Sequence, residues 1–159
     1  TGIGALNLLL ITLLVSPAAK KFKQPWLMKS RRLLGVYAFI YALCHVLNFW
    51  AFEIQFDFIL FFSELLERPY ITLGLIAFLI LLPLALTSFN KVQRSMGRKW
   101  QTLHNFIYLA VVLVSIHFYW SVKSEIIEPM IYIVITLLLL YFRKAKVKRW
   151  FKSSSNNHR

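Results

Sequence analysis

The chain has 159 residues, of which 58% are hydrophobic and only 16% are charged. The charge is unequal, because 19 Lys and Arg residues stand against 6 Asp and Glu residues, giving a net charge of +13. This apolar content excludes a disordered polycation, and it exceeds what a small soluble domain could bury. Apolar and basic residues together indicate an integral membrane protein whose charges lie in its loops.

Five apolar segments in succession predict an all-α transmembrane helical bundle. They cover Ile3–Val15, Leu33–Phe52, Tyr70–Ser88, Leu103–Val122 and Ile126–Phe142. About 20 helical residues cross the ~30 Å hydrocarbon core, and about 17 is the lower limit. The first segment is short and ends at Ser16-Pro17, so we expect its start, and a sixth helix before it, to lie outside this sequence. We expect one transmembrane domain over residues 1–151 and a polar cytoplasmic tail over residues 152–159.

The loops between these segments alternate in charge. Of the 19 basic residues, 17 lie in the 17–32 loop, in the 89–102 loop or after Phe142, whereas all 6 acidic residues lie in the 53–69 and 123–128 loops. The positive-inside rule therefore places the basic loops and the C-terminus in the cytoplasm and the acidic loops on the opposite side. Topology and contact with anionic lipid of the bilayer account for the basic residues, so we expect no nucleic-acid partner.

Function in such a bundle is expected from polar groups inside the spans, where they are costly. No Asp, Glu, Lys or Arg lies within the central spans, which leaves three histidines, His45, His104 and His117. By helix rise, His45 and His117 lie about 10 Å and about 8 Å from the acidic surface, so their rings can face each other. Opposed neutral imidazoles from two helices are a common way to hold a b-type haem.

His104 is different, because it lies near the basic surface, about 20 Å from His117 along the helix axis and about 140° around it. The two rings therefore need not serve one cavity. The alternative function is a non-redox structural, assembly or transport protein whose histidines only bridge helices. Bound haem gives a Soret band, so the colour of the purified protein separates the two classes. The sequence has no CxxCH or H-E-x-x-H motif, which argues against covalent haem and zinc. It also has no Gly-rich phosphate loop, so a nucleotide-binding domain must be elsewhere.

Several longer stretches carry a family resemblance. In chain order they are Lys29–Gly35, Leu43–His45, Glu67–Gly74, Gly97–Asn105 and Ile116–Lys123. Together they resemble the MsrQ (YedZ) family, the haem-binding membrane subunits of bacterial periplasmic methionine sulfoxide reductase systems, within the ferric-reductase-like transmembrane superfamily. The resemblance covers the chain from Thr1 to about Phe151.

The resemblance implies an electron-transfer subunit of the bacterial inner membrane with no substrate chemistry of its own. It implies haem b and FMN as cofactors. Electrons would pass from the respiratory quinone pool to MsrP, a periplasmic molybdenum-cofactor enzyme that reduces methionine sulfoxide and so repairs oxidised proteins. His45, His104 and His117 match the haem-associated histidines of the family. We expect one haem between His45 and His117, with a second at His104 left open.

Four basic residues are candidates for contacts with a flavin phosphate or a quinone headgroup, although almost any basic loop would offer the same chemistry. They are Arg31, Arg32, Arg98 and Lys99. Arg31 and Arg32 also occupy the place where two-haem relatives of the superfamily would have a second histidine on this helix.

Overall fold

The computed structural model describes residues 1–24, 26–122 and 126–144, and this part of the chain is helical without any strand. The elements are α1 (Gly2–Lys21), α2 (Leu27–Asn48), the π-helical turn η1 (Phe49–Glu53), α3 (Phe58–Glu67), α4 (Pro69–Leu86), α5 (Asn90–Met96), α6 (Arg98–His104), α7 (Ile107–Ser121) and α8 (Ile127–Phe142). The loop residues Lys123 and Glu125, together with the expected tail over 152–159, lie outside the described residues.

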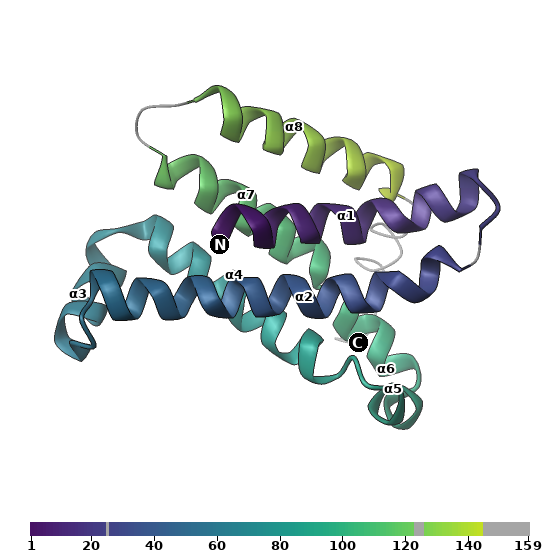
Figure 1. Ribbon diagram of the computed structural model, residues 1–159, viewed down its shortest axis with the longest axis horizontal. Coiled ribbons are helices and arrows are strands. Elements are labelled where there is room, and N and C mark those ends of the chain that lie inside the picture. Colours follow the sequence, from purple (N-terminus) through teal and green to yellow (C-terminus); the bar gives the residue numbers. More distant parts are fainter. Residues whose placement is uncertain (25, 123–125, 145–159) are drawn as a thin grey trace, which may run out of the picture.

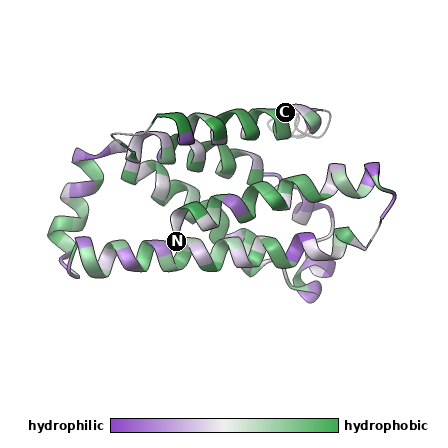
Figure 2. Ribbon diagram, turned by 45° about the horizontal axis from the view of Figure 1, so that its top comes forward, coloured by the Kyte–Doolittle hydropathy of each residue, from purple (hydrophilic) through white to green (hydrophobic). Residues whose placement is uncertain are grey.

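The predicted membrane bundle is confirmed. Four helical stretches in the described residues are long and apolar enough to cross a bilayer: Gly2–Lys21, Ser30–Glu53, Pro69–Leu86 and Arg98–Ser121. The fifth, α8, is apolar but has only 16 residues, near the lower limit for a span. Figure 2 shows the hydrophobic residues along these helices and the hydrophilic ones gathered toward their ends.

Helix α1 lies at the centre of the bundle. It runs along α2 and also contacts α7 and α8, as Figure 1 shows. Leu6, Leu9 and Leu13 of α1 are almost completely buried, and they pack in one cluster with Ala110 and Val111 of α7. A central helix is expected to be apolar on all sides, and α1 has no amphipathic pattern.

The acidic 53–69 segment is not simply a loop, as the sequence analysis assumed, because it contains α3. Asp57 caps this helix: its carboxylate accepts hydrogen bonds from the backbone N–H groups of Ile59 and Leu60, at 2.8 and 3.1 Å. Pro69 then begins α4, a position that suits proline because the first helical N–H has no partner within the helix. Figure 1 shows α3 at the opposite end of α2 from α5 and α6. We call these the acidic end and the basic end of the bundle.

The first helix does not end at Ser16-Pro17, because α1 continues through Pro17 to Lys21. Proline has no N–H, so the carbonyl of Leu13, one turn earlier, loses its usual donor. The guanidinium of Arg143 replaces that donor: its Nη2 donates to the Leu13 carbonyl at 2.6 Å, and its Nη1 donates weakly to the Tyr108 hydroxyl at 3.4 Å. Arg143 is only 3% exposed. A basic residue that the sequence analysis placed beyond the last span therefore joins the end of α8 to α1.

We expect Arg143→Gln to destabilise the protein by about 1–3 kcal/mol, because the shorter side chain leaves the Leu13 carbonyl without a donor. Unfolding by increasing SDS in mixed micelles measures this loss. Pro17→Ala supplies the missing N–H, so the cost of Arg143→Gln should be smaller in that background. Strict additivity of the two changes would show that Arg143 does not act through this carbonyl.

Candidate functional site

The rings of His45 in α2 and His117 in α7 lie together in the half of the bundle toward the acidic end. Their ring centroids are 6.3 Å apart, and the ring planes meet at 71°. Two imidazoles that bind one metal ion from opposite sides, as axial ligands, have ring centroids about 6 Å apart, because each metal–nitrogen bond is about 2 Å long. The separation in this bundle therefore suits a pair of axial ligands.

A backbone carbonyl orients the His117 ring. Its Nδ1 lies 2.6 Å from the carbonyl oxygen of Tyr70, in the first turn of α4. A carbonyl can only accept, so Nδ1 carries the proton in this hydrogen bond, and the lone pair of a neutral ring is left on Nε2. This is the usual support for a metal-binding histidine, because the partner sets both the tautomer and the ring direction.

Each of the two rings packs on a glycine. A Cβ placed on Gly74 would lie 2.9 Å from Cε1 and Nδ1 of His117, and one on Gly2 would lie 3.1 Å from Cε1 of His45. Glycine within a helix costs about 1 kcal/mol relative to alanine, so its presence here has a local use. Gly74 comes one turn after Tyr70, and the same turn of α4 thus gives His117 an acceptor and the space to reach it.

Both rings line a cavity of about 390 Å³. Its walls are mainly apolar and include Leu6, Ala42, Phe49, Phe61, Leu65 and Phe78. Glu53 and Arg68 also line it, both from segments at the acidic end of the bundle. The described residues contain no group of three or more His, Cys, Asp or Glu side chains able to hold a bare metal ion. Two imidazoles in an apolar cavity fit a haem better than they fit a protein-only metal site.

A second cavity, of about 640 Å³, lies at the basic end. Arg31 and Arg32 of α2 line it together with Trp100 and His104 of α6. The His104 ring stacks on Trp100 with centroids 3.9 Å apart, and its Nε2 lies 3.0 Å from the hydroxyl of Thr87. Both cavities have mainly apolar walls, but two arginines line this one.

The helix that carries His104 and His117 is interrupted between them. Helix α6 ends at His104 and α7 begins at Ile107, and the two histidines line different cavities, which share Leu81 as a wall. Of the four basic candidates, Arg31 and Arg32 reach the basic-end cavity. Arg98 and Lys99 are exposed and line neither of these two cavities.

The sequence analysis missed several features of the site. The Tyr70 carbonyl, the two glycines, Thr87 and Arg143 were not considered. Gly74 gave the strongest signal that was overlooked, since it is the one glycine of its apolar span and stands in a stretch that carried the family resemblance. The partners of the other groups depend on how distant helices pack, which no local pattern reveals.

Comparison with known proteins places the chain in a family. A family model described as the ferric reductase like transmembrane component matches residues 1–116. The protein-methionine-sulfoxide reductase heme-binding subunit MsrQ of Cronobacter sakazakii is 47% identical over 154 residues, which cover 96% of this chain and 77% of that protein. Proteins of the same name from Salmonella paratyphi B and Salmonella newport are 46% identical over 153 residues, with the same coverage.

No solved structure matches the chain. The family model spans well over half of the chain, and the relatives match nearly all of it at high identity. The resemblance found in the sequence is therefore confirmed. The chain belongs to the ferric-reductase-like transmembrane family, within its MsrQ branch.

Proposed function

We propose that the chain is a membrane b-type cytochrome subunit, with one haem b held axially by His45 and His117. The observation that carries this proposal is the pair of imidazoles whose ring centroids lie 6.3 Å apart, of which His117 is hydrogen-bonded through Nδ1 to the Tyr70 carbonyl. The relatives are named as heme-binding subunits, which supports the same cofactor. The alternative of helix-bridging histidines would leave the purified protein colourless.

The bound haem would supply one-electron transfer, and the protein would set its surroundings. His45 and His117 would each offer a neutral nitrogen lone pair. The Tyr70 carbonyl would keep the proton of His117 on Nδ1, and Gly74 would let the ring approach α4 closely. The apolar walls of the cavity would exclude water, which is one of the means by which proteins tune a haem.

The proposed partners follow from the reductase system for which the relatives are named. We propose that electrons come from the quinone pool of the bacterial inner membrane and leave to MsrP, a periplasmic molybdoenzyme that reduces methionine sulfoxide. The acidic end would face the periplasm and the basic end the cytoplasm. The His45–His117 cavity lies toward the acidic end, so a haem there would be close to a soluble acceptor on that side.

The basic-end cavity is our proposed entry site for electrons. Arg31 and Arg32 would bind the oxygen-rich headgroup of a quinol or the phosphate of FMN, and Trp100 offers a flat ring beside them. A second haem at His104 would require Nε2 to leave the Thr87 hydroxyl, which lies 3.0 Å away. Arg98 and Lys99, both exposed, have less support for a role in this site.

Removing either proposed ligand should disturb the haem strongly. We expect His45→Ala and His117→Ala each to lose haem or convert it to a high-spin form, because one strong-field ligand is gone. His104→Ala should change this haem much less, since His104 lines the other cavity. Absorption and EPR spectra of the purified variants measure the effect. A normal spectrum in His45→Ala, with all haem lost in His104→Ala, would refute the pairing.

The glycine beneath His117 allows a more conservative test. Gly74→Ala adds a methyl group 2.9 Å from the ring, so we expect it to push His117 off the Tyr70 carbonyl and to weaken haem binding about 10–100-fold, the usual cost of losing such a support. Gly35→Ala is the matched control, because its new methyl group would meet nothing nearer than Thr12 Cγ2 at 4.0 Å. Titration of both variants with haem measures their affinities, and equal affinities would contradict the role of Gly74.

The orientation can be tested in intact cells. In a Cys44→Ser background, Gln55→Cys at the acidic end should react with a membrane-impermeant maleimide, whereas Ser95→Cys at the basic end should react only after permeabilisation. Both positions are exposed, so poor access within the fold does not confuse the result. Labelling of Ser95→Cys alone in intact cells would reverse the orientation and the direction of electron flow with it.

A further inference from the structure

Helix α3 has three distinct faces, although it is only 10 residues long. Around the helix, Phe58, Ile59, Phe62 and Leu66 share one arc of about 100°, because they are spaced i, i+1, i+4 and i+8. Ser63, Glu64 and Glu67 occupy a second arc. Phe61 and Leu65 form the third, and both line the His45–His117 cavity. The helix therefore separates this cavity from two different surroundings.

The first arc is apolar and almost uncovered. Phe58 and Phe62 are each 62% exposed, Ile59 is 84% exposed and Leu66 is 86% exposed. Contiguous exposure of four large apolar side chains to water is unfavourable and marks a surface that binds something apolar. Phe52, in the π-helical turn just before this segment, is 78% exposed and extends the same apolar character toward α2.

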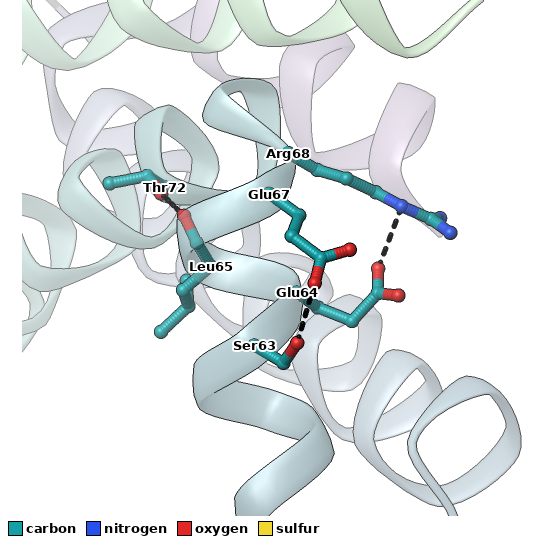
Figure 3. Close-up of polar contacts among 6 residues, drawn as sticks. All are labelled: Ser63, Glu64, Leu65, Glu67, Arg68 and Thr72. Atoms are coloured by element: carbon teal, nitrogen blue, oxygen red, sulfur yellow. Dashed lines mark hydrogen bonds and ion pairs between the residues drawn. The ribbon is translucent and has the colours of Figure 1, made fainter.

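The second arc carries the polar side chains, which contact one another, and it also includes Leu60, which is 40% exposed. Figure 3 shows Ser63, Glu64, Glu67 and Arg68 gathered on one side of α3, where the Arg68 guanidinium pairs with the Glu64 carboxylate at 2.9 Å and the Ser63 hydroxyl donates to Glu67 at 2.9 Å. The junction with α4 is also fixed, since the Thr72 hydroxyl donates to the Leu65 carbonyl at 2.5 Å. Helix α3 thus lies in the chain between the ends of two candidate spans, since η1 precedes it and α4 follows Arg68.

We propose that α3 lies in the interface of the bilayer at the acidic end, with Phe58, Ile59, Phe62 and Leu66 in lipid and the Ser63–Glu64–Glu67 strip in water. The partner of the apolar arc is lipid, because α3 lies in the chain between two candidate membrane spans, Ser30–Glu53 and Pro69–Leu86. No Lys or Arg lies within Phe58–Glu67. The binding of α3 to the bilayer therefore depends on burial of its apolar side chains and not on attraction to anionic headgroups.

One consequence concerns the cavity. With its apolar arc in lipid, α3 would keep Phe61 and Leu65 against the cavity and cover that side of it. A soluble protein approaching from the acidic end would then meet the polar strip and not the apolar arc. This inference concerns the placement of α3 alone and does not depend on the proposed haem.

Spin labels on neighbouring positions test the placement. The full chain in lipid nanodiscs, with Cys44→Ser, would carry a nitroxide at Ile59→Cys or Leu66→Cys on the apolar arc, with Ser63→Cys and Glu67→Cys as matched controls. We expect the first pair to collide with oxygen in preference to a water-soluble nickel chelate and to report a depth of about 5–10 Å, as for interfacial helices. The controls should show the reverse preference.

Two results would overturn the proposal. The labels at 59 and 66 could collide with the nickel chelate as often as the labels at 63 and 67. That result would place the whole of α3 in water. Labels at 59 and 66 that become protected only when a soluble protein is added would make the arc a protein docking face. Ile59, Leu66 and Glu67 are exposed and Ser63 is half-buried, and none of the four belongs to the buried core. The two control variants each remove the hydrogen bond between Ser63 and Glu67.

Discussion

No water is available within a bilayer to hydrogen-bond a polar group that the fold leaves free, so each such group needs a partner inside the protein. This constraint explains the long-range contacts of the bundle. The Leu13 carbonyl, which lacks a helical donor because of Pro17, accepts a hydrogen bond from Arg143. The Ser115 hydroxyl of α7 is hydrogen-bonded to the Thr136 hydroxyl of α8 at 2.9 Å. His117 meets the same need through the Tyr70 carbonyl. The candidate ligand is therefore oriented by the rule that also joins the helices.

The two ends of the bundle surround their histidines with different chemistry. Toward the acidic end, His45 and His117 line a cavity whose walls are mainly apolar. At the basic end, Arg31, Arg32 and His104 surround a larger and more polar cavity. His104 and His117 serve different cavities because 13 residues of helix separate them by about 20 Å along the axis and about 140° around it.

The elements that could be predicted from the sequence are those set by burial in lipid. Every apolar segment expected to span became a helix, and helix rise alone placed His45 and His117 at similar depth. Helix α3 was missed because its 10 residues lie in a segment rich in acids, too short for a span. Helix α1 was cut short at Pro17 because the donor that replaces the missing proline N–H comes from Arg143, 126 positions later in the chain. Arg98 and Lys99 were grouped with Arg31 and Arg32 by charge, but the direction of a side chain depends on packing that charge does not encode.

The same lesson applies to charge at the acidic end. Counted from the sequence, its carboxylates form a rim that could steer a basic partner. Three of them already have partners in or beside α3: Asp57 caps the helix, Glu64 pairs with Arg68, and Glu67 accepts from Ser63. Arg68 also brings a positive charge into this group. Hydrogen bonds from neutral donors leave the charges of Asp57 and Glu67 in place, so among these contacts the Glu64–Arg68 pair alone lowers the net negative charge that a partner would meet.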